Sequence, residues 1–307
     1  MQTAKWGASC WFALIMLAAR LAVLTAQSSS TSSSPTSAAT RSAWPEVDLN
    51  VLDDQGALQK VGKPEIHLFE NGVERPIKIL GSPDSPVSVA LMIDGSGSVF
   101  QRKDAIVAAA KAIVKRLPEG SEVMAVLFSE KAFLDLPFTP VSKVDLSFVD
   151  QMQAGGRTAL YDAIFATEDG LIAHARYARR ALVILSDGED NASHLSRGNA
   201  FWKMEQPGAA VVYPCVLSKA NILQRDLMVG HINMRFLAKE GGGIGFSLDP
   251  DPESAASQIA NAIRNQYALE FTAADPTRDG RKRKIAVQLG VKGAQIHATP
   301  AYFAPLK

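Results

Sequence analysis

The stretch that decides the fold of this sequence is Val87-Ser88-Val89-Ala90-Leu91-Met92-Ile93-Asp94-Gly95-Ser96-Gly97-Ser98. Its apolar part is too short for a helix and is bounded by Pro86 and by glycines, which is typical of a strand buried on both faces of a parallel sheet. The strand ends on a carboxylate, and two hydroxyls follow at alternate positions, where the glycines let the backbone turn tightly. Ligands bind at the ends of the strands in an open α/β sheet. Asp94, Ser96 and Ser98 therefore offer three oxygen ligands to a small hard cation such as Mg²⁺.

Two further segments carry chemistry that fits the same site. Gly155-Gly156-Arg157-Thr158 places a hydroxyl just ahead of a helical pattern. Leu182-Val183-Ile184-Leu185-Ser186-Asp187-Gly188 is a second apolar run, and it ends on an aspartate followed by a glycine. A cluster of Gly, Ser and Asp is ordinary turn composition when it stands alone. The prediction of a metal site therefore depends on the three separated segments together.

The three segments resemble the metal-ion-dependent adhesion site of von Willebrand factor type A domains. That motif is Asp-x-Ser-x-Ser, then a distant Thr, then a distant Asp. The residues that match it, in order, are Asp94, Ser96, Ser98, Thr158 and Asp187. The resemblance implies that the hydroxyls touch a divalent cation, Mg²⁺ or else Mn²⁺ or Ca²⁺, and that the aspartates hold it directly or through water.

The function that the resemblance implies is metal-dependent protein binding, in adhesion or assembly. A cation with few direct carboxylate ligands stays under-neutralised, and it can attract an acidic side chain of a partner protein to complete its coordination. The alternative is a structural subunit of an envelope assembly, in which the metal only stabilises the fold. Loss of partner capture in chelator would favour the first interpretation, whereas unchanged capture with a lower melting temperature would favour the second.

The part of the chain around these motifs alternates strands with helices. Apolar runs predict strands at 122–129, 180–186, 209–217 and 244–248, and helical periodicity predicts helices at 103–117, 158–175, 226–239 and 253–266. Residues 131–140 are expected to pair antiparallel beside the first of these strands. The alternation predicts an α/β fold with a doubly wound, mostly parallel sheet, of the von Willebrand type A or Rossmann-like kind. This domain is expected to span residues 84–266.

The segments on either side, 46–82 and 267–307, have the pattern of short strands. Asn71-Gly72 lies between two such runs and is the strongest short signal for a hairpin. The first segment is too short to form a comfortable domain alone. We therefore expect the two flanks to pack together as one β module, with the α/β domain inserted between them. The whole order resembles that of bacterial extracytoplasmic proteins with a von Willebrand factor type A-related domain.

Residues 1–26 have the pattern of a secretory signal peptide. A lysine gives the positive start, residues 11–19 form an apolar core, and Leu24-Thr25-Ala26 is a small-residue exit. Arg20 interrupts the apolar run, which disfavours a membrane span, and membrane association is expected only if the segment stays uncleaved. Residues 27–45 form a Ser/Thr-rich linker. We therefore expect a protein that is secreted or lies in the periplasm or cell envelope.

The sequence lacks the complete motifs of the enzyme classes that its glycines and hydroxyls suggest. Gly95 adjoins Ser96 directly, so the Gly-x-Ser-x-Gly nucleophile elbow is absent. Phe100 stands where a dinucleotide fingerprint needs its third glycine, and the five histidines show no zinc spacing. We expect neither enzymatic activity nor a small-molecule substrate.

The remaining charged residues give weaker signals. A net charge of +1 gives no reason to expect a nucleic-acid partner. The basic cluster formed by Arg278 and residues 281–284 is expected to be a solvated loop, because no aromatic platform accompanies it. Residues 189–191, Glu-Asp-Asn, either add oxygen ligands for a second cation or only tune the local charge. Cys215 is the one cysteine outside the signal segment, so it cannot form an internal disulfide and is expected in the core.

Overall fold

The computed structural model describes residues 45–52, 58, 60–62, 65–217, 224–290 and 293–306. The expected signal peptide and all but the last residue of the expected linker lie outside these residues. Among the described residues, no helix is both long enough and apolar enough to cross a membrane.

The centre of the molecule is a six-stranded sheet whose strands follow the spatial order β10-β9-β8-β5-β6-β7. Its strands are β5 (Ser88–Asp94), β6 (Glu122–Phe128), β7 (Ala132–Pro140), β8 (Arg180–Ser186), β9 (Val211–Val216) and β10 (Phe246–Ser247). All pairs are parallel except that of β6 with the edge strand β7. Every residue of β5 and β8 is buried, as an interior strand of a parallel sheet requires. The predicted α/β fold with a mostly parallel sheet is confirmed.

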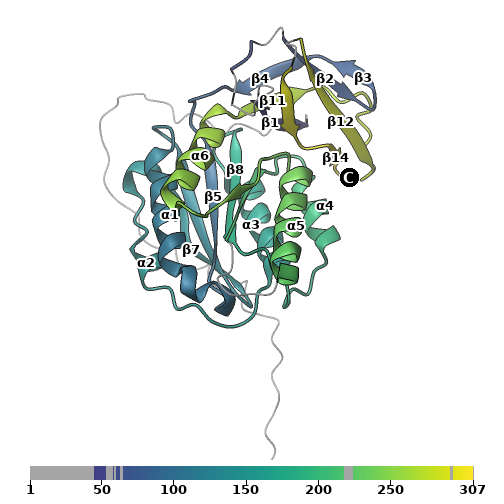
Figure 1. Cartoon of the computed structure of the whole chain (residues 1–307). Coiled ribbons are helices and arrows are strands. Elements are labelled where there is room, and N and C mark those ends of the chain that lie inside the picture. Colours follow the sequence, from purple (N-terminus) through teal and green to yellow (C-terminus); the bar gives the residue numbers. More distant parts are fainter. Residues whose placement is uncertain are drawn as a thin grey trace, which may run out of the picture. The chain divides into compact units, whose positions relative to one another are not determined.

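Helices cover both faces of this sheet (Figure 1). The helices are α1 (Lys103–Arg116) and α6 (Pro252–Asn265) on one face, and α3 (Leu160–His174), α4 (Arg197–Met204) and α5 (Gln224–Glu240) on the other; short turns are η2 (Gly97–Arg102), η3 (Val141–Lys143) and α2 (Ser147–Asp150). Residues such as Ile106 and Ile113 on α1 bury the apolar stripe that the sequence predicts. Cys215 lies in the same core.

Strands from both flanks form two smaller sheets, in the orders β13-β1-β11-β4 and β14-β12-β2-β3. Their strands are β1 (Glu46–Leu52), β2 (Ile66–Glu70), β3 (Val73–Arg75), β4 (Ile77–Gly81), β11 (Tyr267–Phe271), β12 (Lys282–Leu289), β13 (Gln295–Ala298) and β14 (Ala301–Phe303). The predicted hairpin joins β2 to β3 through Asn71 and Gly72, whose φ angles of 49° and 84° are those of a tight primed turn. The last two strands, β13 and β14, are separated at Pro300, because proline has no N–H for a ladder.

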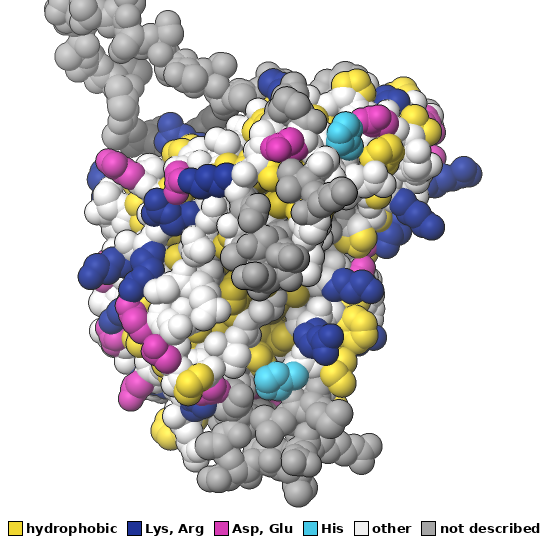
Figure 2. All heavy atoms as spheres, turned by 45° about the horizontal axis from the view of Figure 1, so that its top comes forward, with side chains coloured by type: hydrophobic (Ala, Val, Ile, Leu, Met, Phe, Trp, Pro, Cys, Tyr) yellow, Lys and Arg dark blue, Asp and Glu magenta, His cyan; other side chains and the backbone are white. Residues whose placement is uncertain are grey.

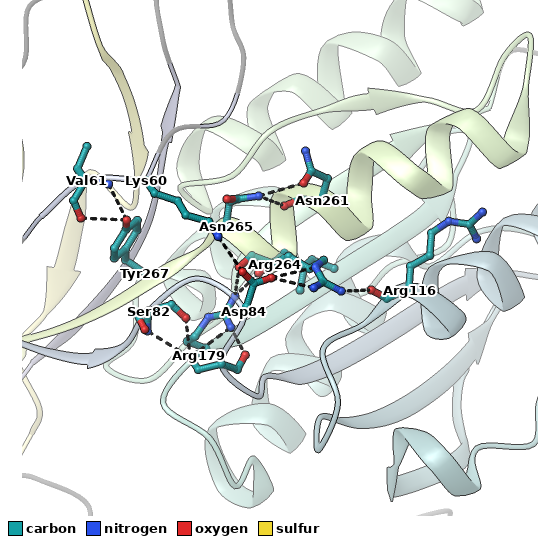
Figure 3. Close-up of polar contacts among 12 residues, drawn as sticks. Lys60, Val61, Ser82, Asp84, Arg116, Arg179, Asn261, Arg264, Asn265 and Tyr267 are labelled. Carbon is teal, nitrogen blue, oxygen red and sulfur yellow. Dashed lines mark hydrogen bonds and ion pairs between the residues drawn. The ribbon is translucent and has the colours of Figure 1, made fainter.

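A buried arginine fastens the segment between β4 and β5 to helix α6. Arg179 donates to the carbonyl oxygens of Ser85, Ile263 and Arg264 (Figure 3). The two α6 carbonyls also accept the backbone N–H groups of Gln266 and Asp84, so each of them accepts two hydrogen bonds at the end of the helix. Burial lowers the pKa of its guanidinium. Gly81 leaves room for this side chain, since a Cβ there would lie 2.5 Å from Arg179 Cγ.

A second buried network joins β1 to the starts of β8 and β9. The Tyr213 hydroxyl donates to Asn50 Oδ1 at 2.6 Å. The Gln266 side-chain amide donates to Asp48 Oδ2 at 2.6 Å and to the Arg180 carbonyl oxygen at 2.9 Å. The β module is therefore bonded to the α/β sheet through buried polar groups as well as through apolar contacts.

Candidate metal site

The Asp94 carboxylate is fixed at the end of β5 by two neighbours. Its Oδ1 accepts the Ser96 N–H at 2.8 Å, and its Oδ2 accepts the Ser186 hydroxyl at 2.6 Å. Ser96 Oγ lies 3.0 Å from Ser98 Oγ. Asp94 and Ser96 are fully buried, whereas Ser98 is exposed. The first three predicted ligands are thus adjacent, with Ser98 on the solvent side.

Backbone hydrogen bonds bring the second predicted segment against the first. The Gly97 N–H donates to the Gly156 carbonyl at 3.0 Å, and the Gly155 N–H donates to the Gly95 carbonyl at 2.8 Å. A Cβ on Gly97 would lie 3.3 Å from the Gly156 oxygen. The glycines in both loops therefore allow the close approach that the site needs.

Thr158 is buried between this loop and the loop that follows β8. Its N–H donates to Asn191 Oδ1 at 2.9 Å, and its carbonyl oxygen accepts the N–H groups of Asn191 and Ala192. Asp190 Oδ1 accepts the hydroxyl of Ser193. Asp190 and Asn191 thus use these two oxygens to hold the loop against Thr158.

Asp187 follows β8, the strand that pairs with β5 in parallel register, so the two strands end at the same edge of the sheet. Its side chain is buried, and its Oδ1 accepts the Glu189 N–H at 3.0 Å. Helix α5 packs directly on this turn, where Asn233 Nδ2 donates to the Gly188 carbonyl at 2.8 Å. A Cβ on Gly230 would overlap the Asp187 carbonyl oxygen. The turn is therefore fixed by its own hydrogen bond to Asp187 and by the packing of α5 on it.

The electrostatics of the pair favour a cation. Burial, with a smaller contribution from the nearby charge of Asp187, raises the pKa of Asp94 to about 6 despite the hydrogen bonds from Ser186 and Ser96, which lower it. Two carboxylates and three hydroxyls are hard oxygen donors, the kind that Mg²⁺, Mn²⁺ and Ca²⁺ prefer. The residues present therefore fit a divalent cation. Within the described ranges, no three His, Cys, Asp or Glu side chains come together as a metal site.

The sequence did not indicate two residues that organise the site. Ser186 joins β8 to the Asp94 carboxylate, and its hydroxyl also accepts the Gly188 N–H at 3.0 Å. Asn191 fixes the backbone of Thr158. A hydroxyl next to Asp187, the aspartate that follows β8, was the one available signal for Ser186. Nothing in the sequence indicated the role of Asn191.

The central part of the chain is similar to a known family. Residues 89–189 match the family model described as von Willebrand factor type A domain. No curated protein matches the chain.

Three solved structures illustrate what the chain resembles. The PilB minor pilin from Streptococcus sanguinis is 14% identical over 61% of this chain and 63% of its own, with a TM-score of 0.44. A von Willebrand factor type A protein from Catenulispora acidiphila is 12% identical over 87% of this chain and 75% of its own, with a TM-score of 0.46. Proximal thread matrix protein 1 from the mussel byssus, described with a zinc-occupied MIDAS motif, is 13% identical over 64% of this chain and 49% of its own, with a TM-score of 0.48. The chain thus spans less than two thirds of the pilin and about half of the thread protein.

Proposed function

We propose that this protein is a divalent-metal-dependent protein-binding module that acts in adhesion or assembly outside the cytoplasm, because residues 89–189 match the family model described as von Willebrand factor type A domain. The proposed ligands of Mg²⁺, or of Mn²⁺ or Ca²⁺, are Asp94, Ser96, Ser98, Thr158 and Asp187. The observation that supports this most directly is the meeting of three loops at one sheet edge, where hydrogen bonds tie Gly97 to Gly156 and Ser186 to Asp94. We propose binding, and no chemical turnover, as the output of this site.

The proposed partner presents an acidic side chain. Three of the five proposed ligands are neutral hydroxyls, so the protein supplies charge only through Asp94 and Asp187. When bound, the divalent cation would be balanced in formal charge by these two aspartates, but the five side chains leave one of the six positions of an octahedron open, and a carboxylate from outside would fill it as a strong ligand. Ser98 is the exposed member of the set, so the partner is expected to approach from its side.

Calorimetric titration of the full chain with Mg²⁺ and with Mn²⁺ tests the ligand set. We expect heat of binding for wild type and none for Asp94→Ala. Ser98→Ala should weaken binding, while the matched control Ser142→Ala, at an exposed serine in η3, should leave the affinity unchanged. A metal at about one hundred times its Kd should also stabilise the fold by about 2.7 kcal/mol. Equal heats from wild type and Asp94→Ala would contradict the assignment.

The partner chemistry has its own variant. Ser96→Asp supplies a third carboxylate from within, so the cation should be retained while the need for an outside acid is reduced. The variant should therefore keep its Mg²⁺ heat and lose affinity for an acidic partner. If it keeps that affinity, the metal does not recruit an acid, and the structural-subunit interpretation is favoured.

A further inference from the structure

Helix α5 carries a row of basic residues that lines a hollow on the surface. His231, Arg235 and Lys239 recur at four-residue spacing, which places them on one side of the helix. They line a hollow of about 750 Å³, whose other wall includes Ile296 and His297 of β13. We call this feature the α5 hollow.

The α5 hollow has an unbalanced charge. Among the described residues that line it, none is Asp or Glu. The side chains of His231, Arg235 and Lys239 form no hydrogen bond or ion pair with any residue that the structure describes. Other basic residues are paired: Lys203 with Asp169, for example. The like charges of Arg235 and Lys239, one helical turn apart, therefore repel each other, and an anionic ligand in the hollow would relieve that repulsion.

Exposed apolar side chains run beside the basic row. Ile232 and Phe236 of α5 are 44% and 41% exposed. Together with Arg235 and Lys239 they line a second hollow of about 380 Å³. Figure 2 shows Lys and Arg side chains next to exposed hydrophobic side chains at the lower right of the face it presents. Such an arrangement suits a ligand that offers both acidic and apolar groups.

We propose that the α5 hollow binds an acidic, partly apolar segment of a partner protein. A segment of chain can enter a concave site and contact both α5 and β13, whereas a flat lipid surface cannot reach the inner wall. The N-terminal part of this same chain is not a suitable occupant, because residues 1–44 contain no Asp or Glu. The surface does not depend on the metal, although Gly230 and Asn233 of α5 pack on the Asp187 turn.

Fluorescence anisotropy with a labelled peptide, Glu-Leu-Glu-Glu-Phe-Glu-Leu-Glu, tests the proposal on the full chain in the presence of chelator, so that the metal site takes no part. We expect saturable binding that weakens with added salt. The double variant Arg235→Glu with Lys239→Glu should lose roughly tenfold or more in affinity. The matched control is Lys115→Glu with Lys143→Glu, which makes the same charge change at exposed residues of α1 and η3. The affinity of this control variant for the peptide should stay within about twofold of that of wild type.

Three outcomes decide whether the α5 hollow binds an acidic segment, once the melting temperatures show that both double variants are folded. Binding that is lost only in the Arg235 and Lys239 variant, and lost for a peptide with Gln in place of Glu, supports the proposal. Equal binding by the two double variants overturns it. Sedimentation with phosphatidylserine vesicles in the absence of peptide binding also overturns it, because the surface would then recognise lipid.

Discussion

A buried acid in the body of the α/β domain should make the stability of this protein fall with rising pH. Glu168 of α3 is fully buried, and its Oε2 accepts the Ala210 N–H at 3.1 Å. Its Oε1 has no hydrogen-bond partner among the described residues. Burial raises the pKa of Glu168 to about 8, and the charges of Lys203 and Arg180 only partly oppose this. The carboxyl group is therefore protonated in the folded protein at neutral pH.

The expected size of the effect follows from that pKa. In the unfolded chain Glu168 ionises near its ordinary value of 4.5, and in the folded chain near 8. The stabilisation is therefore fully present below pH 4.5 and is lost as the pH rises through 8. Between about pH 5.5 and about pH 7.5, the unfolded state alone releases this proton. The free energy of unfolding should fall by about 1.4 kcal/mol per pH unit, or about 2.7 kcal/mol in all, from this group.

Urea unfolding of wild type and Glu168→Gln at these two pH values measures that fall. Glutamine keeps an acceptor for the Ala210 N–H and cannot ionise, so the variant should gain about 2.7 kcal/mol on wild type between the two pH values. The matched control is Thr167→Val, next to Glu168, whose buried Oγ1 also has no partner among the described residues. Its stability should run parallel to wild type at both pH values. If the free energy of unfolding of Glu168→Gln changes with pH as that of wild type does, Glu168 is already ionised in the folded protein.

Two further predictions test the supports of the site and of the β module. Gly230→Ala forces a methyl group against the Asp187 carbonyl, so it should lower the free energy of unfolding by about 1–3 kcal/mol. It should also weaken Mg²⁺ binding measured by calorimetry. The control Gly198→Ala, where a Cβ meets only Ser196 Oγ at 3.5 Å, should change neither quantity. Tyr213→Phe leaves the buried Asn50 Oδ1 without its 2.6 Å hydrogen bond from Tyr213, so it should lower the free energy of unfolding by about 1–3 kcal/mol. A loss of less than about 0.3 kcal/mol would show that this hydrogen bond does not hold the β module in place.

The fold was predictable where the signal is local and periodic. In β5 the apolar run Val89–Ile93 ends on Asp94, and all seven residues of the strand are buried. The stripe on α1 has a clear helical period. The eight-residue helix α4 was not predicted, because it is too short for a period to emerge; its start at Ser196, capped reciprocally with Asn199, was the signal that could have located it.

The candidate site was predictable only in part, for a similar reason. Asp94, Ser96 and Ser98 are close in sequence, so their proximity follows from one turn. The bond from Ser186 to Asp94 depends on the parallel register of β5 and β8, and that register is set by the whole sheet. Whether these residues hold a cation stays a prediction, which the titration above tests.

The first flank shows how a correct pattern can give an incomplete inference. The sequence Val47-Asp48-Leu49-Asn50-Val51 alternates apolar and polar residues, which ordinarily indicates a strand with one face in solvent. In the structure the polar face is buried as well: Asn50 is fully covered, and Asp48 Oδ2 accepts the Arg180 N–H at 3.1 Å. The polar side chains face the start of the α/β sheet, where buried hydrogen bonds replace water. A strand periodicity tells which residues share a face, but it does not tell what covers that face. The same holds at residue 266, where the α/β domain was expected to end. The Gln266 side-chain amide donates hydrogen bonds to β1 of the β module and to β8 of the α/β sheet, so the two parts are bonded to each other at this position.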